Sequence, residues 1–134
     1  MKTYIITFGC SANQNDSEIM AGLLKNAGHE IVKDIKKSEV ILINTCIVKG
    51  PAESKAKTLI KNINRRFHDK KLVIAGCMPA AEIKLLREIA PDASFLSPQN
   101  IGRIVEIVER KSETAEFVKK AHTPKLNLPR IRKN

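Results

Sequence analysis

The order of apolar runs along the chain is the feature that most restricts its fold. Three runs are apolar or β-branched almost throughout: Thr3–Gly9, Glu39–Thr45 and Lys71–Gly76. Such runs are typical of strands buried on both faces. Segments with apolar residues at helical spacing follow them. Strands that alternate with helices in this way favour a parallel sheet covered by helices on both faces.

Two weaker runs, at residues 29–34 and 93–97, predict two further strands. Helical spacing predicts a first helix capped by Asp16 or Ser17 and ended by Gly28. Three more helices are expected to begin near these residues: Pro51, Pro79 and Ile101. We therefore predict an α/β fold with a five-stranded parallel sheet, helices on both faces and the flavodoxin-like strand order 2-1-3-4-5.

The chain is large enough for one domain with a real core, because 43% of its 134 residues are hydrophobic. It has no run of about 18 apolar residues, the length that spans a membrane. Its first ten residues do not resemble a signal peptide, so we expect a cytoplasmic or nuclear protein with reduced thiols, and of the two we predict the cytoplasm. The periodic pattern ends near residue 110. We expect a folded domain at 1–110 and a basic linker toward a further domain at 111–134.

Every cysteine of the chain follows a predicted strand. Cys10, Cys46 and Cys77 come after the first, third and fourth strands, and Gly9 and Gly76 precede two of them. In the order 2-1-3-4-5 these strands are neighbours, about 4.8 Å apart, and their carboxyl ends share one edge of the sheet. The three thiols are therefore expected within reach of one small inorganic centre. The spacing excludes the paired CxxC knuckles of structural zinc sites.

Three thiolates suit iron–sulfur, zinc or copper centres. On a [4Fe–4S] cluster they leave one iron open, whereas zinc requires a fourth ligand and the three histidines are poorly placed for that role. Asn13, Asn44 and Thr45 are candidates to hydrogen-bond cluster sulfurs or a ligand, although they are also ordinary turn and strand-end residues. The alternative for the cysteines is that they are small buried apolar residues.

The formal net charge is +10, so polyanions are plausible partners. Residues 49–71 carry eight basic residues against two acidic ones, and residues 111–134 carry seven against two. Lys57, Lys61 and Arg65 are four apart and line one face of the second predicted helix. This face either guides RNA phosphates or is simply solvated.

Three segments resemble the cysteine motifs of the tRNA methylthiotransferases. They are "GCSANQNDSEIM", "NTCIVKGPAESKAK" and "AGCMP", and they occur in the family's order within residues 1–110. The stretches "VKGPAESK" and "GCMP" are most similar to the archaeal and eukaryotic branch, which acts on N6-threonylcarbamoyladenosine in tRNA. One departure is Ala80, where relatives often carry Gln.

This resemblance implies a radical S-adenosylmethionine enzyme that adds a methylthio group to C2 of the modified adenosine next to the anticodon. It implies that Cys10, Cys46 and Cys77 bind an auxiliary [4Fe–4S] cluster. It also implies a central domain with a second cluster on a CxxxCxxC motif, and a C-terminal domain that helps to bind tRNA. The chain contains no CxxxCxxC. The resemblance therefore implies a cluster-binding domain that does not itself bind S-adenosylmethionine and is inactive alone.

Two other classes remain open from the residues. One is a flavodoxin-like or receiver-like ligand-binding module, although the chain lacks an acidic cluster after its first strand and has no glycine-rich phosphate loop. The other is a thiol redox protein in which two of the cysteines form a disulfide.

Overall fold

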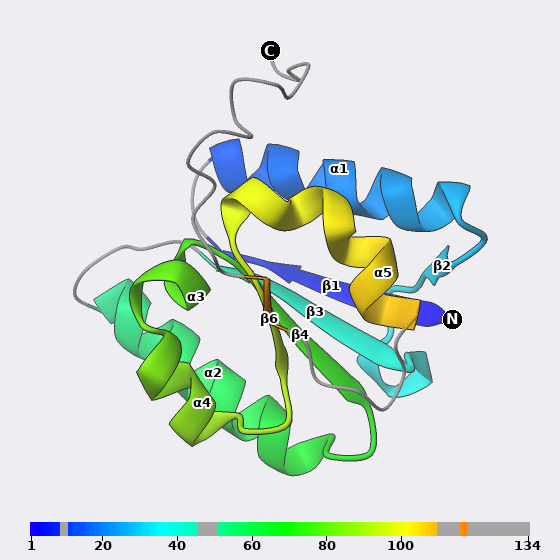
Figure 1. Cartoon of the computed structure of the whole chain (residues 1–134). Coiled ribbons are helices and arrows are strands. Elements are labelled where there is room, and N and C mark those ends of the chain that lie inside the picture. The colour runs from blue at the N-terminus through cyan, green and yellow to red at the C-terminus, as the bar shows by residue number, and fades with distance from the viewer. Residues whose placement is uncertain (9–10, 46–50, 110–115, 118–134) are drawn as a thin grey trace.

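Strands and helices alternate along the chain as the sequence predicts (Figure 1). The computed structural model describes residues 1–8, 11–45, 51–109 and 116–117. The strands are β1 (Lys2–Thr7), β2 (Glu30–Ile31), β3 (Val40–Thr45), β4 (Lys71–Gly76), β5 (Ser94–Leu96) and β6 (Glu116–Phe117). The α-helices are α1 (Ser11–Asn26), α2 (Pro51–Arg66), α3 (Cys77–Ala81), α4 (Ile83–Ile89) and α5 (Ile104–Glu109). Two short 3-10 helices are η1 (Ile35–Lys37) and η2 (Pro98–Arg103).

The sheet is parallel throughout, with the order β2-β1-β3-β4-β5-β6. Its first five positions confirm the predicted order 2-1-3-4-5. The sixth strand was not predicted, and it adds two residues beside β5 from the segment that we expected to be linker. Arg87 on α4 donates from Nε to Glu116 of β6 over 2.9 Å. This hydrogen bond lowers the pKa of the Glu116 carboxyl.

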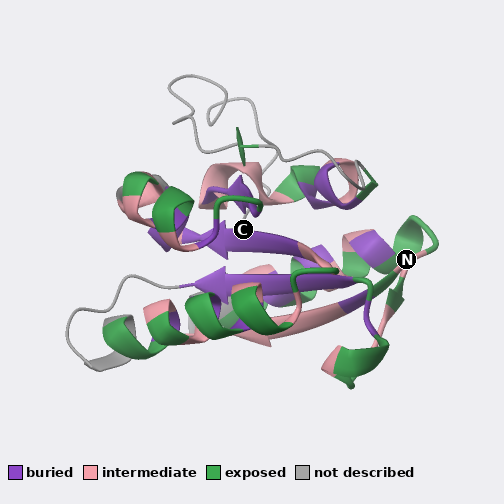
Figure 2. Cartoon of the chain, turned by 90° about the horizontal axis from the view of Figure 1, so that it is seen from below, coloured by how far each residue is buried: buried purple, intermediate pink, exposed green. Residues whose placement is uncertain are grey.

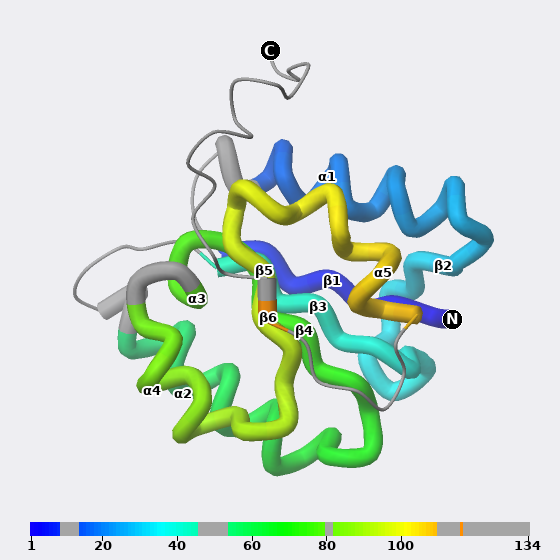
Figure 3. Tube along the Cα trace, viewed as in Figure 1, coloured from blue at the N-terminus to red at the C-terminus, as the bar shows by residue number. Residues whose placement is uncertain are grey.

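Helices cover both faces of the sheet and form three layers (Figures 1 and 3). The helices α1 and α5 lie on one face, and α2, α3 and α4 lie on the other. Successive side chains of β3 alternate between two cores, so that Ile41 and Ile43 join the α2 side whereas Val40 and Leu42 join the α1 side. All of β3 is buried, and Figure 2 shows the central strands enclosed between helices whose outer surfaces are exposed.

The predicted apolar stripe of α2 is confirmed. Ala56, Ile60 and Ile63 are buried against the sheet, and Leu59 and Phe67 pack at the margin of the same core. These positions recur at three- and four-residue intervals, which places them on one side of an α-helix. The packing leaves the opposite side of α2, including Lys61 and Arg65, exposed to solvent.

The first helix begins at Ser11, so the prediction that Asp16 or Ser17 caps it was wrong. Ser17 lies inside the helix and is buried, with its hydroxyl bonded to side chains on β1 and β3. Local sequence suggests a cap because a serine hydroxyl often bonds the backbone at a helix start. Here tertiary neighbours use that hydroxyl instead. The predicted stop at Gly28 is confirmed, with a φ of +93° that favours glycine.

The third predicted helix is divided. In place of one helix starting at Pro79, α3 begins at Cys77 and α4 follows after Glu82. Glu82 has a φ of −132° and a ψ of 43°, which are not helical values. The first of the two helices therefore begins directly at the cysteine.

Asp16 provides a test of charge burial on α1. Partial burial raises the pKa of its carboxyl because desolvation disfavours the ionised form. The ionised carboxylate therefore destabilises the fold at neutral pH, and this cost disappears as the pH falls below the ordinary value of 3.8. We expect Asp16→Asn to raise the thermal unfolding midpoint at pH 7, with a gain that shrinks toward pH 4. The control Glu18→Gln changes an exposed carboxyl on the same helix, and equal gains in both variants would contradict this interpretation.

Candidate metal centre

The strands β1, β3 and β4 end level with one another at the carboxyl edge of the sheet. The register pairs Thr7 with Asn44 and Thr45 with Gly76. Beyond β1, the amide of Phe8 donates to the Asn44 carbonyl over 2.9 Å. The three strands that precede the cysteines are thus adjacent and end at the same edge, which is the arrangement that the sequence predicted for them.

The structure describes one of the three cysteines. Cys77 is the first residue of α3 and is partly exposed. Cys10 and Cys46 lie outside the described residues, and so does the side chain of Asn13 in the first turn of α1. Within the described ranges, no group of three or more His, Cys, Asp or Glu residues is placed to hold a metal ion. That search covers only one of the three thiols.

At Gly76, the last residue of β4 before Cys77, there is no room for a side chain against β3. The φ of Gly76 is +100° and its ψ is −157°, a region that is essentially restricted to glycine. A Cβ at this position would lie 2.1 Å from the Thr45 carbonyl oxygen and 2.8 Å from Asn44 Oδ1. A glycine is therefore required before Cys77 both by the backbone conformation and by the contact with β3.

Thr45 joins β3 to the turn that carries Cys77. Its buried hydroxyl donates to the Ala75 carbonyl over 2.7 Å and accepts from the Met78 amide over 3.2 Å. The two backbone groups stand on either side of Gly76 and Cys77. The hydroxyl thus closes the Cys77 turn against the end of β3.

Asn44 joins β3 to the opposite neighbour. Its Nδ2 donates to Ser17 Oγ on α1 over 3.0 Å, and Ser17 Oγ lies 2.6 Å from Thr7 Oγ1 on β1. Sequence reasoning missed Thr7 and Ser17. The available signal was that Thr7 ends the first strand and Asn44 lies next to the end of the third, so that parallel pairing brings the two positions to one edge. No local signal places Ser17 beside them.

The three basic residues predicted on α2 do not have equal surroundings. Lys61 and Arg65 are exposed on the outer surface of the helix. Lys57 is partly buried, and its Nζ lies 3.1 Å from Glu82 Oε1. Because Glu82 offsets the charge of Lys57, Lys61 and Arg65 are the members of this set that remain candidates for contact with a polyanion.

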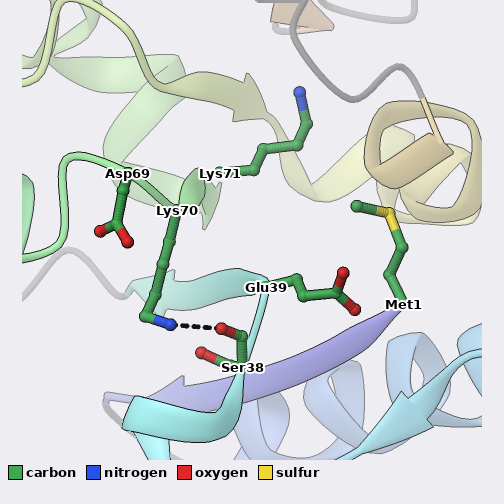
Figure 4. Close-up of a pocket in the computed structure, with 6 residues that line it drawn as sticks. All are labelled: Met1, Ser38, Glu39, Asp69, Lys70 and Lys71. Carbon is green, nitrogen blue, oxygen red and sulfur yellow. Dashed lines mark hydrogen bonds between the residues drawn. The ribbon is translucent and has the colours of Figure 1, made fainter.

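A hollow of about 450 Å³ opens at the opposite edge of the sheet, where the central strands begin (Figure 4). Its lining residues are Met1, Ser38, Glu39, Asp69, Lys70 and Lys71. The Lys70 ammonium donates to the carbonyls of Lys36 and Ser38, and the Lys2 amide donates to Glu39 over 2.9 Å. These groups hold the loops at the start of the strands. The length of β4 separates the hollow from Cys77, so it is not part of the candidate centre.

Residues 2–97 match the family described as "Uncharacterized protein family UPF0004". The chain belongs to this family. It is 40% identical, over its whole length, to a probable threonylcarbamoyladenosine tRNA methylthiotransferase of Methanothermobacter thermautotrophicus. It is 35% identical, over 99% of its length, to the threonylcarbamoyladenosine tRNA methylthiotransferase of Danio rerio. These matches confirm the family resemblance found in the cysteine motifs.

The chain spans 32% of the first of these relatives and 25% of the second. Among solved structures, a response regulator from Burkholderia multivorans aligns with a TM-score of 0.56 at 13% identity, covering 91% of this UPF0004 chain and 99% of the regulator. That likeness establishes a shared fold. In the part of the chain that is described, no helix is both long and apolar enough to cross a bilayer.

Proposed function

We propose that this UPF0004 chain is the auxiliary [4Fe–4S]-binding domain of a cytoplasmic threonylcarbamoyladenosine tRNA methylthiotransferase. Cys10, Cys46 and Cys77 are the proposed ligands. The observation that carries the proposal is the pairing of Thr45 with Gly76, because these residues immediately precede Cys46 and Cys77 in the sequence. The pairing of Thr7 with Asn44 brings the strand before Cys10 to the same edge.

The residues of this edge suit an iron–sulfur cluster. The donor set consists of thiols, which are the ligands that such clusters take. A [4Fe–4S] cluster bound through three thiolates would have one iron without a protein ligand. That iron would offer an open coordination position for a sulfur ligand. The chain's own part is to hold and orient the thiols. Because Gly76 has no side chain, the end of β4 can lie against the backbone of β3 immediately before Cys77.

The activity as a whole belongs, in this proposal, to a longer protein. Relatives at 35–40% identity are named as methylthiotransferases and are three to four times longer than the matched region. We propose that residues 1–110, extended by strand β6, form the cluster-binding domain and that the rest of residues 111–134 leads to a radical S-adenosylmethionine domain and a tRNA-binding domain. Those two further domains would bind S-adenosylmethionine and make most of the contacts with tRNA. The isolated cluster-binding domain would be inactive.

Anaerobic reconstitution with iron and sulfide tests the cluster site. We expect about four irons per wild-type chain, and a loss of this uptake in Cys10→Ala, Cys46→Ala and Cys77→Ala. Thr58→Ala, an exposed change on α2, is the control for handling and should load as wild type does. Iron and sulfide analysis with visible absorbance measures the result. A reduced, well-folded wild type that takes up no iron would refute the proposal, and reversible disulfide formation in that chain would favour a thiol redox protein.

A second prediction concerns tRNA contact through α2. If Lys61 and Arg65 neutralise tRNA phosphates, Lys61→Glu/Arg65→Glu should reduce the slope of log K against log salt by about 2, since each contact accounts for about 1. Lys25→Glu/Lys33→Glu changes the net charge equally at exposed positions elsewhere and is the matched control. The measurement is tRNA binding to the chain across a series of salt concentrations. Equal slopes in the two double variants would show that the α2 face is only solvated.

A further inference from the structure

The last two residues of β3 connect that strand to both of its neighbours. Asn44 and Thr45 are successive strand residues, so their side chains project to opposite faces of the sheet. Asn44 reaches α1 on one face, and Thr45 reaches the start of α3 on the other. Both residues are buried, and Cys46 follows them directly.

On the α1 face, the hydrogen bonds join β1 and α1, the elements that precede and follow Cys10 in the sequence, to the end of β3. Asn44 Nδ2 bonds Ser17 of α1, and Ser17 bonds Thr7 at the end of β1. Cys10 lies between β1 and α1 in the sequence. The three side chains therefore fix the two elements that flank Cys10 against the strand that precedes Cys46.

On the α3 face, the Thr45 hydroxyl bonds backbone groups on both sides of Cys77. Thr45 Oγ1 bonds the Ala75 carbonyl at 2.7 Å and the Met78 amide at 3.2 Å. Met78 is itself fully buried in the core under α2, so this bond lies away from bulk water. A buried polar group that loses its hydrogen-bond partner destabilises the fold. The two bonds of the Thr45 hydroxyl therefore restrict movement of the Cys77 turn.

We propose that Asn44 and Thr45 are positioning residues that set the places of the Cys10 and Cys77 segments relative to Cys46 before any metal is bound. The inference rests on the proposed function and deepens it, since it names the groups that preorganise the cluster site. The hydrogen bonds to Ser17, Ala75 and Met78 run to the protein framework, so this role differs from direct hydrogen bonding to cluster sulfurs. It predicts effects that are specific to one side of β3.

The side-specific effects can be measured on the reduced, metal-free chain. Thr45→Val removes the hydroxyl and preserves the side-chain shape. It should increase amide exchange at Met78 and alkylation of Cys77 by about tenfold, while Cys10 reacts at the wild-type rate. Ser17→Ala should increase the alkylation rate of Cys10 and leave that of Cys77 unchanged. Peptide mass spectrometry resolves each cysteine. If a variant only destabilised the fold, the alkylation rates of all three cysteines would rise together.

Two variants keep the test independent of overall stability. Thr45→Ser retains the hydroxyl and should restore the wild-type rates. Thr3→Val makes the same substitution at a buried position of β1, near the opposite edge, where the hydroxyl has no hydrogen-bond partner among the described residues. It should leave the reactivity of all three cysteines unchanged. Circular dichroism verifies that each variant is folded.

The link to the metal centre is tested by loading the same variants with iron and sulfide. We expect the loaded Thr45→Val chain to lose iron to a chelator about tenfold faster than wild type, and Thr45→Ser to behave as wild type. Unchanged Cys77 reactivity in Thr45→Val, or faster reactivity with wild-type iron retention, would overturn the inference. Failure of wild type itself to take up iron would instead refute the proposed function, so the two failures are distinguishable.

Discussion

Gly76→Ala is expected to lower the free energy of unfolding by about 3 kcal/mol or more. Two independent costs combine. The backbone at φ +100° and ψ −157° is strained for any residue with a Cβ. The new methyl group would also lie 2.1 Å from the Thr45 carbonyl oxygen, so β3 and β4 would have to separate. Urea denaturation of both proteins measures the difference.

Gly22→Ala is the matched control for this prediction. Gly22 lies within α1, and a Cβ there would meet nothing within 4 Å. Alanine is favoured over glycine in a helix interior by up to about 1 kcal/mol, so this variant should be neutral or more stable. Because Gly76 precedes Cys77, Gly76→Ala should also reduce iron uptake. A Gly76→Ala chain as stable as wild type would show that the strands separate without cost.

Phe95→Ala is the other change with a large expected effect. Phe95 on β5 is 1% exposed and belongs to the core between the sheet and α2. Removing a buried phenyl ring costs about 3–5 kcal/mol, because the transfer free energy is lost and a cavity remains. We expect a lower urea midpoint with an unchanged m-value, which indicates lost stability without a change in the unfolded state.

Phe67→Ala provides the comparison. Phe67 packs only at the margin of the same core, and its ring lies beneath Arg66 and Lys70, at 5.6 and 6.0 Å from the centroid. Partial burial should make its loss clearly smaller than that of Phe95. Similar losses at the two positions would mean that ring burial does not determine the stability of this core.

Much of the fold could be predicted because the relevant signals are local. The burial of all of β3, and of β4 after Lys71, appears in the sequence as continuous apolar runs, and the α2 stripe appears as helical spacing. The strand order also follows, because parallel strands joined by helices have few acceptable arrangements. From that order came the expectation that three cysteines share one edge. The register of Thr45 with Gly76 confirms the strand arrangement on which this expectation depends.

Other features could not be predicted, since they depend on partners far away in the chain. Ser17 suggests a helix cap until Thr7 and Asn44 are placed beside it. The strand β6 has two residues and exists through its pairing with β5 and the contact of Glu116 with Arg87. In the same way, Lys57 belongs to the basic face by spacing, but Glu82, which lies between α3 and α4, pairs with it.

The sequence by itself thus determined the α/β class, the strand order and the sharing of one sheet edge by the three strands that precede the cysteines. Covalent order and hydrophobic periodicity are sufficient for these features. Only the tertiary structure decided how that edge is held: Gly76 against the backbone of Thr45, the Thr45 hydroxyl across the Cys77 turn, and Asn44 on Ser17. Hydrogen bonds and close contacts depend on distances of a few tenths of an ångström between segments about 30 residues apart, and no local pattern encodes them.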